Sequence, residues 1–381
     1  MTNFRGFRSL KIDFNDRMNV FVGVNGAGKS SVLDCIAIML SRLISKFNSP
    51  KGGYREFAES DITNGEQGTV NEIEIEAEGI WTKWKIPKSR KILGKRDSLS
   101  YVNMGDLEEK IRKNLIENEH YNLPLCVYYG VNRNINSVSV GIRKNHDFSQ
   151  LSAYDQALSG NHSDFNLFFE WFRDREDYEN EKVRENRSYH DLQLETVRNA
   201  IERFTGFTDL KVKRETPRLE LKKGNEYFDV QQLSEGEKCF LALVGDIARR
   251  LAIANPGLEF PLEGEGVILI DEIDLHLHPS WQRTIISRLC DVFPKCQFIV
   301  STHSPVVISH VKPASLYLMY KEDSIVKVTN PDESFGKNSD RILEDIMDVS
   351  ARPAEVEKEL NQLFENIERK NLREARAGFL V

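Results

Sequence analysis

A glycine-rich segment near the start of the sequence has the residue types that bind phosphate. Gly23–Ser30 fits the pattern Gly-x-x-x-x-Gly-Lys-Ser and lies between an apolar run and a segment with apolar residues at helical spacing. The backbone N–H groups of such a loop, and the N-terminus of the helix after it, attract anions. We therefore expect a nucleotide here, with Lys29 beside the β- and γ-phosphates and the Ser30 hydroxyl on Mg²⁺. The residues expected to contact ATP are Asn25, Gly26, Ala27, Gly28, Lys29, Ser30 and Ser31.

Two adjacent acidic residues supply the other half of this chemistry. Asp271 and Glu272 follow the all-apolar run 267–270, which predicts a buried strand that ends in two carboxylates. Asp271 is expected to hold Mg²⁺ through water opposite Ser30, and Glu272 to polarise the water that attacks the γ-phosphate. An acidic pair at a strand end is also common as a solvated turn, but a phosphate loop upstream favours the catalytic interpretation.

A third segment resembles a motif of the ATP-binding-cassette ATPases. Leu233–Lys238 begins a long predicted helix and is similar to that family's signature sequence, which contacts ATP held by the opposite subunit. The resemblance implies that Ser234, Gly236 and Glu237 contact nucleotide across a dimer interface. Ser234 and Glu237 also fit a capping box, in which each side chain bonds the other's backbone N–H. Both interpretations can hold together.

The last motif follows another predicted buried strand. Ser301–Pro305 is similar to the switch-histidine segment of the same family, so the resemblance implies that His303 donates to the γ-phosphate. It would then act in catalysis together with Lys29 and Glu272. Asp274 occupies the position of the family's D-loop, which lies along the dimer seam. Phosphate loop, signature, acidic strand end and switch histidine thus occur in the family's order.

The hydrophobic pattern of the whole chain predicts an α/β fold. Strands are expected at 10–14, 18–22, within 69–86, and at 125–129, 219–221, 227–230, 267–270 and 297–301. Helices are expected from 32, from 165, and at 192–204, 231–254, 280–292 and 354–376. We expect an ATP-binding-cassette head domain, with a P-loop core, an antiparallel β subdomain, a helical insertion and a helical C-terminal tail. The expected divisions are 1–150 for the N-terminal lobe, 151–206 for the insertion, 207–330 for the C-terminal lobe and 331–381 for the tail, where a partner could dock.

The resemblance extends to one branch of this superfamily. Asn3–Phe7 and Asp271–Gln282 look like the RecF/OLD-like ATPases of bacteria, and 169–180 and 334–353 look like the PtuA ATPases of Septu anti-phage systems and their relatives in retrons. This implies a homodimer, or a higher oligomer of dimers, around MgATP and a separate HNH-type, PtuB-like nuclease subunit. Relatives usually carry a further stretch of β-strand before Asn3, which implies a trimmed or alternative start. No Asp-x-Asp pair follows the switch histidine, so we expect no nuclease activity in this chain itself.

Composition restricts the class of protein. The chain has 381 residues, of which 40% are hydrophobic and 29% charged, as in folded globular proteins. No apolar run approaches the roughly 18 residues of a membrane span, and five scattered cysteines without a Cys-x-x-Cys pair indicate reduced thiols. We therefore expect a cytoplasmic protein with no membrane contact. The net charge of −7 provides no general attraction for nucleic acid, so any DNA contact must be local.

Several polar features have two interpretations. Lys83–Arg96 carries seven basic residues and Trp84 without an acid, and it fits a nucleic-acid backbone or a solvated hairpin equally well. His276 and His278 suggest a metal, but without evident third and fourth ligands the dimer-interface interpretation is favoured. The remaining candidates are Asp61 or Gln67 for the family's Q-loop, and Arg133 for a phosphate or partner contact.

Two functions fit these observations. The first is an anti-phage defence ATPase that holds or gates a nuclease partner, with the insertion or the charged C-terminal helices as the docking surface. The second is a RecF-like DNA-repair ATPase that binds DNA directly. The nucleotide-binding subunit of a transporter is disfavoured by the long insertion and by Glu237 in the signature.

Overall fold

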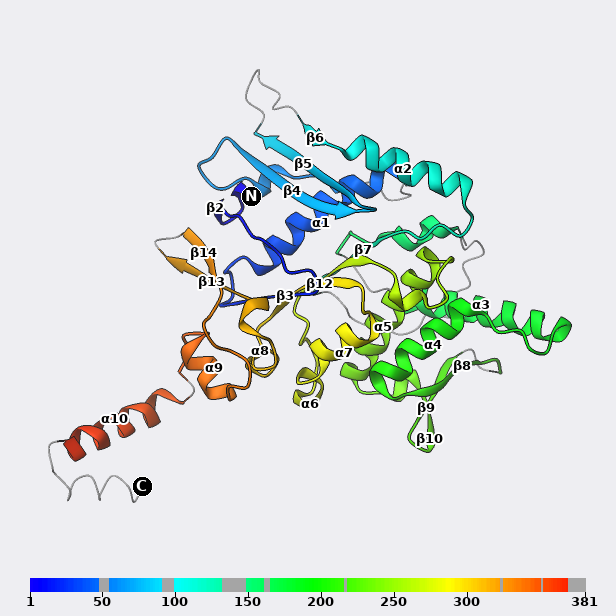
Figure 1. Ribbon diagram of the computed structural model, residues 1–381. Helices are drawn as coiled ribbons and strands as arrows, with labels where there is room; N and C mark the ends of the chain where they lie inside the picture. Colours follow the sequence, from blue (N-terminus) through cyan, green and yellow to red (C-terminus); the bar gives the residue numbers. More distant parts are fainter. Residues whose placement is uncertain are drawn as a thin grey trace.

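A six-stranded sheet forms the centre of the protein (Figure 1). The computed structural model describes residues 1–47, 55–90, 99–131, 149–160, 165–215, 218–322, 325–350 and 352–368. The strand order is β14-β13-β3-β12-β11-β7, and all neighbours are parallel except the edge pair β13 and β14. The bounds are β3 Met18–Gly23, β7 Leu125–Tyr129, β11 Gly266–Ile270, β12 Cys296–Thr302, β13 Leu316–Glu322 and β14 Ile325–Thr329. β3 and β7 are buried along their whole length, which explains their uninterrupted apolar runs.

Helix α1 lies between this sheet and a second, antiparallel one. α1, Lys29–Phe47, contacts β4 on one side and β3, β7, β11 and β12 on the other. Because it is covered from both sides, its apolar residues extend around most of the helix rather than along one stripe. The antiparallel sheet has the order β2-β1-β4-β5-β6. Its bounds are β1 Thr2–Phe4, β2 Phe7–Ser9, β4 Gly68–Ala77, β5 Ile80–Ser89 and β6 Ser100–Val102.

Helix α5 contacts β7 of the central sheet, and two further helices and a small sheet pack beyond it. The helices are α3 Phe165–Glu185, α4 Leu192–Thr205 and α5 Glu235–Ala254, and the antiparallel sheet has the order β10-β9-β8. The strand bounds are β8 Thr208–Lys213, β9 Arg218–Lys223 and β10 Glu226–Asp229. The rings of Phe204 and Phe240 meet edge to face at 5.2 Å, an arrangement that contributes about 0.5–1.5 kcal/mol beyond burial. The helices within 151–206 therefore share a core with α5, while the proposed division of the chain stays a prediction.

Shorter elements complete the fold. The remaining helices are α2 Met104–Glu117, α6 Pro279–Gln282, α7 Ile285–Val292, α8 Pro305–Ile308, α9 Ser339–Asp345 and α10 Ala354–Glu368. Single 3₁₀ turns occupy Glu59–Asp61, Gln150–Tyr154, Val230–Gln232, Pro261–Glu263 and Pro313–Ser315. α10 extends away from the rest of the protein in Figure 1. Among the described residues, no helix combines the length and the apolar character needed to cross a bilayer.

Two expectations about elements were wrong. Leu10–Phe14 alternates like a strand but forms no strand in the described structure, where only Leu10 exchanges backbone hydrogen bonds, with Met1. The expected helix at 280–292 is divided into α6 and α7 by a turn at Arg283 and Thr284, where Thr284 has a φ of −114°. The β13–β14 hairpin was not expected from the sequence at all.

Candidate nucleotide site

Neighbouring strands of the central sheet end together and bring the predicted motifs to one edge. In the parallel register, Thr302 on β12 lies beside Val22 on β3, and Ile270 on β11 lies beside Val300 on β12. The segments that follow these strands must therefore emerge side by side. They are the phosphate loop, the acidic pair and the switch-histidine segment, which lie far apart in the sequence.

The backbone of the phosphate loop requires its glycines. Gly23, Gly26 and Gly28 have φ values of 152°, 77° and 99°, a region that residues with a Cβ rarely adopt. A Cβ on Gly23 would lie 2.1 Å from the carbonyl oxygen of Met319, and one on Gly28 would lie 2.5 Å from the Phe7 ring. Space beside Gly26 is open. Asn25, Gly26 and Ser30 are exposed on the loop, and Ala27 is buried beneath it.

Lys29 is buried at the start of α1 and points back into its own loop. Its ammonium group donates to the carbonyl oxygens of Gly23 at 2.7 Å and Val24 at 3.2 Å. Burial lowers the pKa of Lys29 to about 8, although the negative charges of Asp271 and Glu272 oppose this shift. A buried cation beside two acids and a glycine-rich turn is suited to receive phosphate oxygens.

Ser301 organises the acidic strand end. Its hydroxyl donates to Asp271 Oδ1, and the same hydroxyl oxygen accepts the backbone N–H of Glu272 at 2.8 Å. Asp271 is buried, and its own N–H donates to the carbonyl of Tyr129 at 2.8 Å. Glu272 has a φ of 49°, which few non-glycine residues adopt and which is common at functional sites. The sequence placed Ser301 in a motif but did not reveal this role.

A side-chain hydroxyl likewise joins the switch-histidine segment to the D-loop. The Thr302 hydroxyl donates to Asp274 Oδ1, and its oxygen accepts the N–H of Ser304 at 3.0 Å. His303, between Thr302 and Ser304 in the sequence, is partly buried. Burial, and then the charge of Lys29, lower the pKa of His303 below its usual value, against the opposing effect of Glu272. A neutral imidazole at this place can donate one N–H without carrying a charge.

The signature segment begins α5 and lies against the D-loop of the same chain. Ser234 is exposed and caps the helix: it accepts the N–H of Glu237, while Glu237 accepts the Ser234 N–H at 3.0 Å. Lys223 on β9 pairs with Glu237 at 2.6 Å. Burial would raise the pKa of Glu237, but Lys223 and the Ser234 hydrogen bonds outweigh it and lower that pKa. A Cβ on Gly236 would lie 2.6 Å from the carbonyl oxygen of His276, so only glycine allows this approach.

An arginine that the sequence did not single out lies beside the phosphate loop. Arg5 donates to Asp61 at 2.9 Å and to Asp34 on α1 at 2.7 Å, and its distance to the Ser31 hydroxyl is 3.4 Å. Asp61 is buried, and Ala58 N–H also donates to its carboxylate. The two candidates for the Q-loop thus differ in burial: Asp61 is buried, whereas Gln67 is exposed on the surface. The assignment of the Q-loop stays a prediction.

The structure bears on two of the alternative interpretations, the basic stretch and the histidine pair. Trp84 is buried and donates to the carbonyl of Met39 at 3.2 Å, so its ring belongs to the core and cannot stack on a base. Lys83 pairs with Glu72 and Glu74, whereas the part of the basic stretch from 91 to 96 lies outside the described residues, as does Arg133. His278 caps α6 by accepting the N–H of Ser280.

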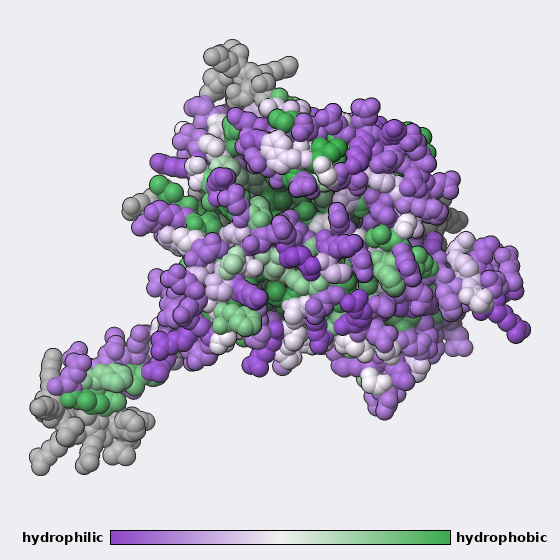
Figure 2. Space-filling model, viewed as in Figure 1, coloured by the Kyte–Doolittle hydropathy of each residue, from purple (hydrophilic) through white to green (hydrophobic). Residues whose placement is uncertain are grey.

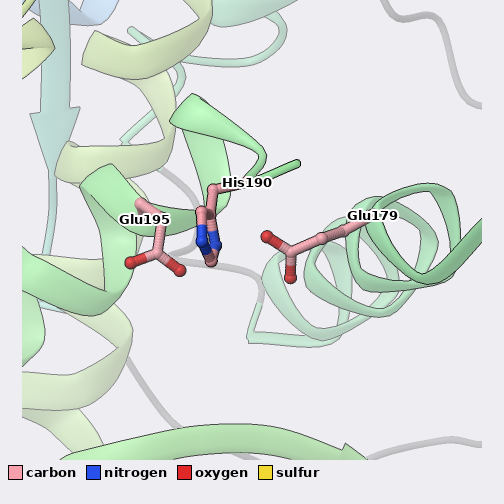
Figure 3. A group of neighbouring side chains, drawn as sticks. All are labelled: Glu179, His190 and Glu195. Atoms are coloured by element: carbon pink, nitrogen blue, oxygen red, sulfur yellow. The ribbon is translucent and has the colours of Figure 1, made fainter. Parts of the chain in front are cut away.

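A group of possible metal ligands lies away from these motifs, between α3 and α4. Ligand atoms of Glu179, His190 and Glu195 lie within 4.8 Å of one another, and Figure 3 shows the imidazole between the two carboxylates. Arg198 already donates to Glu179 at 3.1 Å and to Glu195 at 2.6 Å. Glu179 also accepts the N–H of Asp191 at 2.9 Å. Because these carboxylates are already neutralised and join two helices, we interpret the group as structural.

The residues at the sheet edge fit a nucleotide with a divalent cation. The exposed loop turns at Gly26 into open space, which leaves room for phosphate oxygens. The Ser30 hydroxyl and the Asp271 carboxylate are oxygen donors, the type of ligand that Mg²⁺ prefers. Lys29 supplies positive charge from below the loop.

Comparison with known proteins identifies the family. The model of a family described as AAA domain matches residues 1–230. The chain belongs to this family. It is also 31% identical to the retron Ec83 probable ATPase of Escherichia coli over 93% of this chain and 76% of that protein. Septu protein PtuA of Bacillus thuringiensis is 25% identical over 90% of this chain and 81% of its own length.

A solved structure supports the fold. The Smc head domain of Pyrococcus furiosus, crystallised with an extended coiled coil and bound to the C-terminal domain of ScpA, superposes with a TM-score of 0.50. The two chains are 16% identical, and the match covers 90% of this chain and 97% of that one. This similarity concerns the fold alone. Together the comparisons confirm the predicted fold class: this AAA-family chain is an ATP-binding-cassette type ATPase related to PtuA.

Proposed function

We propose that this chain binds and hydrolyses MgATP as the ATPase subunit of an anti-phage defence system, forms a homodimer around the nucleotide, and controls an HNH-type nuclease subunit. The observation that supports the chemistry best is the meeting of Lys29, Asp271, Glu272 and His303 at one sheet edge. The charges of Asp271 and Glu272 act to raise the pKa of Lys29, and the charge of Lys29 acts to lower the pKa of His303. Residues from three separate segments converge on this one place.

Each side chain has a role in the proposed reaction. Lys29 would bind the β- and γ-phosphates, and Ser30 and Asp271 would hold Mg²⁺, which neutralises phosphate charge when it is bound. Glu272 would polarise the attacking water, and its position is held by Ser301. His303 would donate to the γ-phosphate. Asn25, Gly26, Ala27, Gly28 and Ser31 would line the nucleotide with their backbone and hydroxyl groups.

The proposed dimer rests on the signature segment. Ser234 is exposed at the N-terminus of α5, where the helix dipole favours an anion. Gly236 brings this helix end against the D-loop that contains Asp274. Ser234, Gly236 and Glu237 of one copy would therefore face the nucleotide of the other copy, and the two D-loops would lie along the seam.

A partner would dock on the C-terminal tail. In α10, Val356, Phe364 and Ile367 are exposed and share one face by helical spacing. The same helix extends from the body of the protein, and Figure 2 shows hydrophobic residues on it. An amphipathic helix with an uncovered apolar face suits a groove on another protein. The retron and Septu names of the relatives support a defence system as the setting.

Turnover by two variants tests the chemistry. Lys29→Ala should lose ATP binding and hydrolysis, and Glu272→Gln should bind ATP but hydrolyse it at least about 100-fold more slowly. Both should remain folded, as judged by circular dichroism. Wild-type turnover in either variant would refute the site.

The oligomeric state tests the proposed dimer. Sedimentation of Glu272→Gln with saturating MgATP should show dimers, and the same sample with ADP should not. Ser234→Ala combined with Glu272→Gln should weaken this dimer without weakening binding of ATP to one chain. Monomers of Glu272→Gln at saturating MgATP would exclude the composite site.

Capture of the nuclease tests the biological role against DNA repair. Phe364→Glu should reduce co-purification of an HNH-type nuclease encoded beside this chain, whereas Gln362→Glu, on the opposite face of α10, should not. Strong, salt-sensitive DNA binding by the isolated chain, with no effect of Phe364→Glu, would favour the RecF-like repair function instead.

A further inference from the structure

The signature turn at the start of α5 carries two acidic residues. Glu235 and Glu237 lie on either side of Gly236, within the first turn of the helix. Acidic side chains suit this end of a helix in an isolated chain, because the helix dipole stabilises negative charge there. In the proposed dimer, however, the same helix end receives the γ-phosphate of the other copy. Both carboxylates would then repel the ligand that the turn must bind.

Each of these acids has a lysine of its own. Lys238 pairs with Glu235 at 3.0 Å, which is an ordinary pair between residues three apart on one helix. Lys223 comes from a different element, the end of β9, and donates to Glu237 Oε1 at 2.6 Å. The exposed fraction of the Glu237 side chain is 13%, against 68% for Glu235. Water therefore screens the charge of Glu235 well and that of Glu237 poorly, so the cation beside Glu237 has the larger effect.

The carboxylate of Glu237 is charged at neutral pH and holds the serine of the signature. Burial opposes its ionisation, but Lys223 and the hydrogen bonds from Ser234 lower the pKa of Glu237 below its usual value. Its Oε2 accepts the N–H of Ser234 at 3.0 Å and the Ser234 hydroxyl at 2.9 Å. The hydrogen that Ser234 would donate to a phosphate is thus directed at a carboxylate of its own chain. Because a carboxylate paired with a cation attracts a proton donor less strongly than an unpaired one, Lys223 weakens this competing bond.

The fold holds Lys223 beside the signature. β9 and β10 form a tight hairpin, and Lys223 lies opposite Glu226 next to its turn. β10 then continues through the 3₁₀ turn Val230–Gln232 into Ser234, so a short stretch of chain connects the hairpin to α5. The Lys223 ammonium also lies 5.9 Å from the centre of the buried Phe207 ring. A backbone register and an aromatic contact therefore keep this charge near Glu237.

We propose that Lys223 is a positioning residue that prepares the signature to receive a phosphate from the other copy, by neutralising Glu237 and weakening its bond to the Ser234 hydroxyl. The inference rests on the proposed dimer and adds a residue that none of the four motifs contains. Lys223 acts through Glu237 and does not itself touch the nucleotide. Its contribution should therefore disappear when position 237 carries no charge.

A double-mutant cycle tests this inference. All chains carry Glu272→Gln, so that the ATP-bound dimer accumulates, and sedimentation with saturating MgATP gives the dissociation constant of the dimer. Lys223→Met removes the charge but keeps an apolar stem over Phe207. We expect it to weaken the dimer about 5- to 30-fold, because a symmetric dimer contains the pair twice. Combined with Glu237→Gln, which keeps the capping bonds, Lys223→Met should change the dissociation constant less than about twofold.

The neighbouring lysine provides a matched control. Lys222→Met removes the same charge from the next position of β9, where the side chain points to the opposite face of the strand. This variant should leave the dissociation constant of the dimer within about twofold of that of Glu272→Gln alone. Binding of ATP to a single chain, measured below the concentration at which dimers form, should be the same with and without Lys223→Met. A loss there would place Lys223 at the nucleotide of its own chain and contradict the inference.

The possible failures can be told apart. A dimer that Lys223→Met leaves intact, or that Lys222→Met weakens as much, would refute the inference alone. An equal loss with and without Glu237→Gln would also refute it, because Lys223 would then act through its own phosphate contact or through the stability of the hairpin. If Glu272→Gln alone stayed monomeric at saturating MgATP, the proposed dimer and this inference would fall together.

Discussion

The hydroxyl of Ser301, on strand β12, holds the carboxylate of Asp271, which ends the neighbouring strand β11. The same oxygen accepts the N–H of Glu272, so one serine positions both acids of the proposed site. We expect Ser301→Ala to lower kcat for ATP about 10- to 100-fold, the range seen when a supporting hydrogen bond of a metal ligand is removed. The affinity for ATP without Mg²⁺ should change little.

The control for Ser301→Ala is a second buried serine in the same region. Ser309 donates to the carbonyl of Val306 at 2.9 Å and has no contact with either acid. Ser309→Ala should keep kcat within about twofold of wild type. Equal losses in both variants would mean that Ser301 acts only through general stability.

Replacement of Gly236 should uncouple the signature helix from the D-loop. In Gly236→Ala, the new Cβ would lie 2.6 Å from the His276 carbonyl, so one of the two backbones must shift, at a cost of about 1–3 kcal/mol. We expect ATP to bind each chain as before but the ATP-dependent dimer to weaken, as measured by sedimentation. Gly105→Ala, where space is open on α2, should leave the dimer unchanged.

Asp246 on α5 should be important for stability. It pairs with Arg249 at 2.6 Å and Arg250 at 2.7 Å and accepts the hydroxyl of Tyr129 on β7 at 2.9 Å. Asp246→Ala would leave buried guanidinium groups without their partner, and we expect it to lower the free energy of unfolding by about 3–5 kcal/mol in urea. Glu109→Ala, at an exposed position of α2, should change it by less than about 0.5 kcal/mol.

Asp246 should also make the stability of the protein depend on pH. Burial alone would raise the pKa of Asp246, but Arg250 and Arg249 outweigh it and hold that pKa well below its usual value. Its contribution is therefore complete above the unfolded pKa near 4 and is lost as the pH falls below that value. Between about pH 5 and pH 2, the wild type should lose more free energy of unfolding than Asp246→Ala. Parallel curves would contradict this assignment.

Arg5 should stabilise the segment that leads from β1 to the phosphate loop. It bridges Asp34 on α1 and the buried Asp61, and Arg5→Ala leaves that buried carboxylate without its cation. We expect a loss of about 1–3 kcal/mol in the free energy of unfolding. Arg8→Ala, which removes an exposed arginine of the same hairpin, should have a much smaller effect in the same urea titration.

The sequence alone determined the elements and motifs whose signals are local. Apolar runs located β3, β7, β11 and β12 within one or two residues, because strands buried on both faces need apolar residues throughout. The glycines of the phosphate loop were recognisable because their backbone angles exclude other residues. Ser234 and Glu237 were recognisable as a helix cap because the capping box is a local pattern of two residues only three positions apart.

Only the tertiary structure decided which distant residues meet. Trp84 looked available for a base, and its burial against Met39 on α1 depends on how two sheets enclose that helix. Ser301 reaches Asp271 because β11 and β12 are neighbours in a parallel sheet, and no pattern within either segment encodes that order. Leu10–Phe14 has the side-chain alternation of a strand, but a strand also needs a neighbour that supplies backbone hydrogen bonds. Periodicity reports which side chains are buried; pairing between segments is a property of the folded chain.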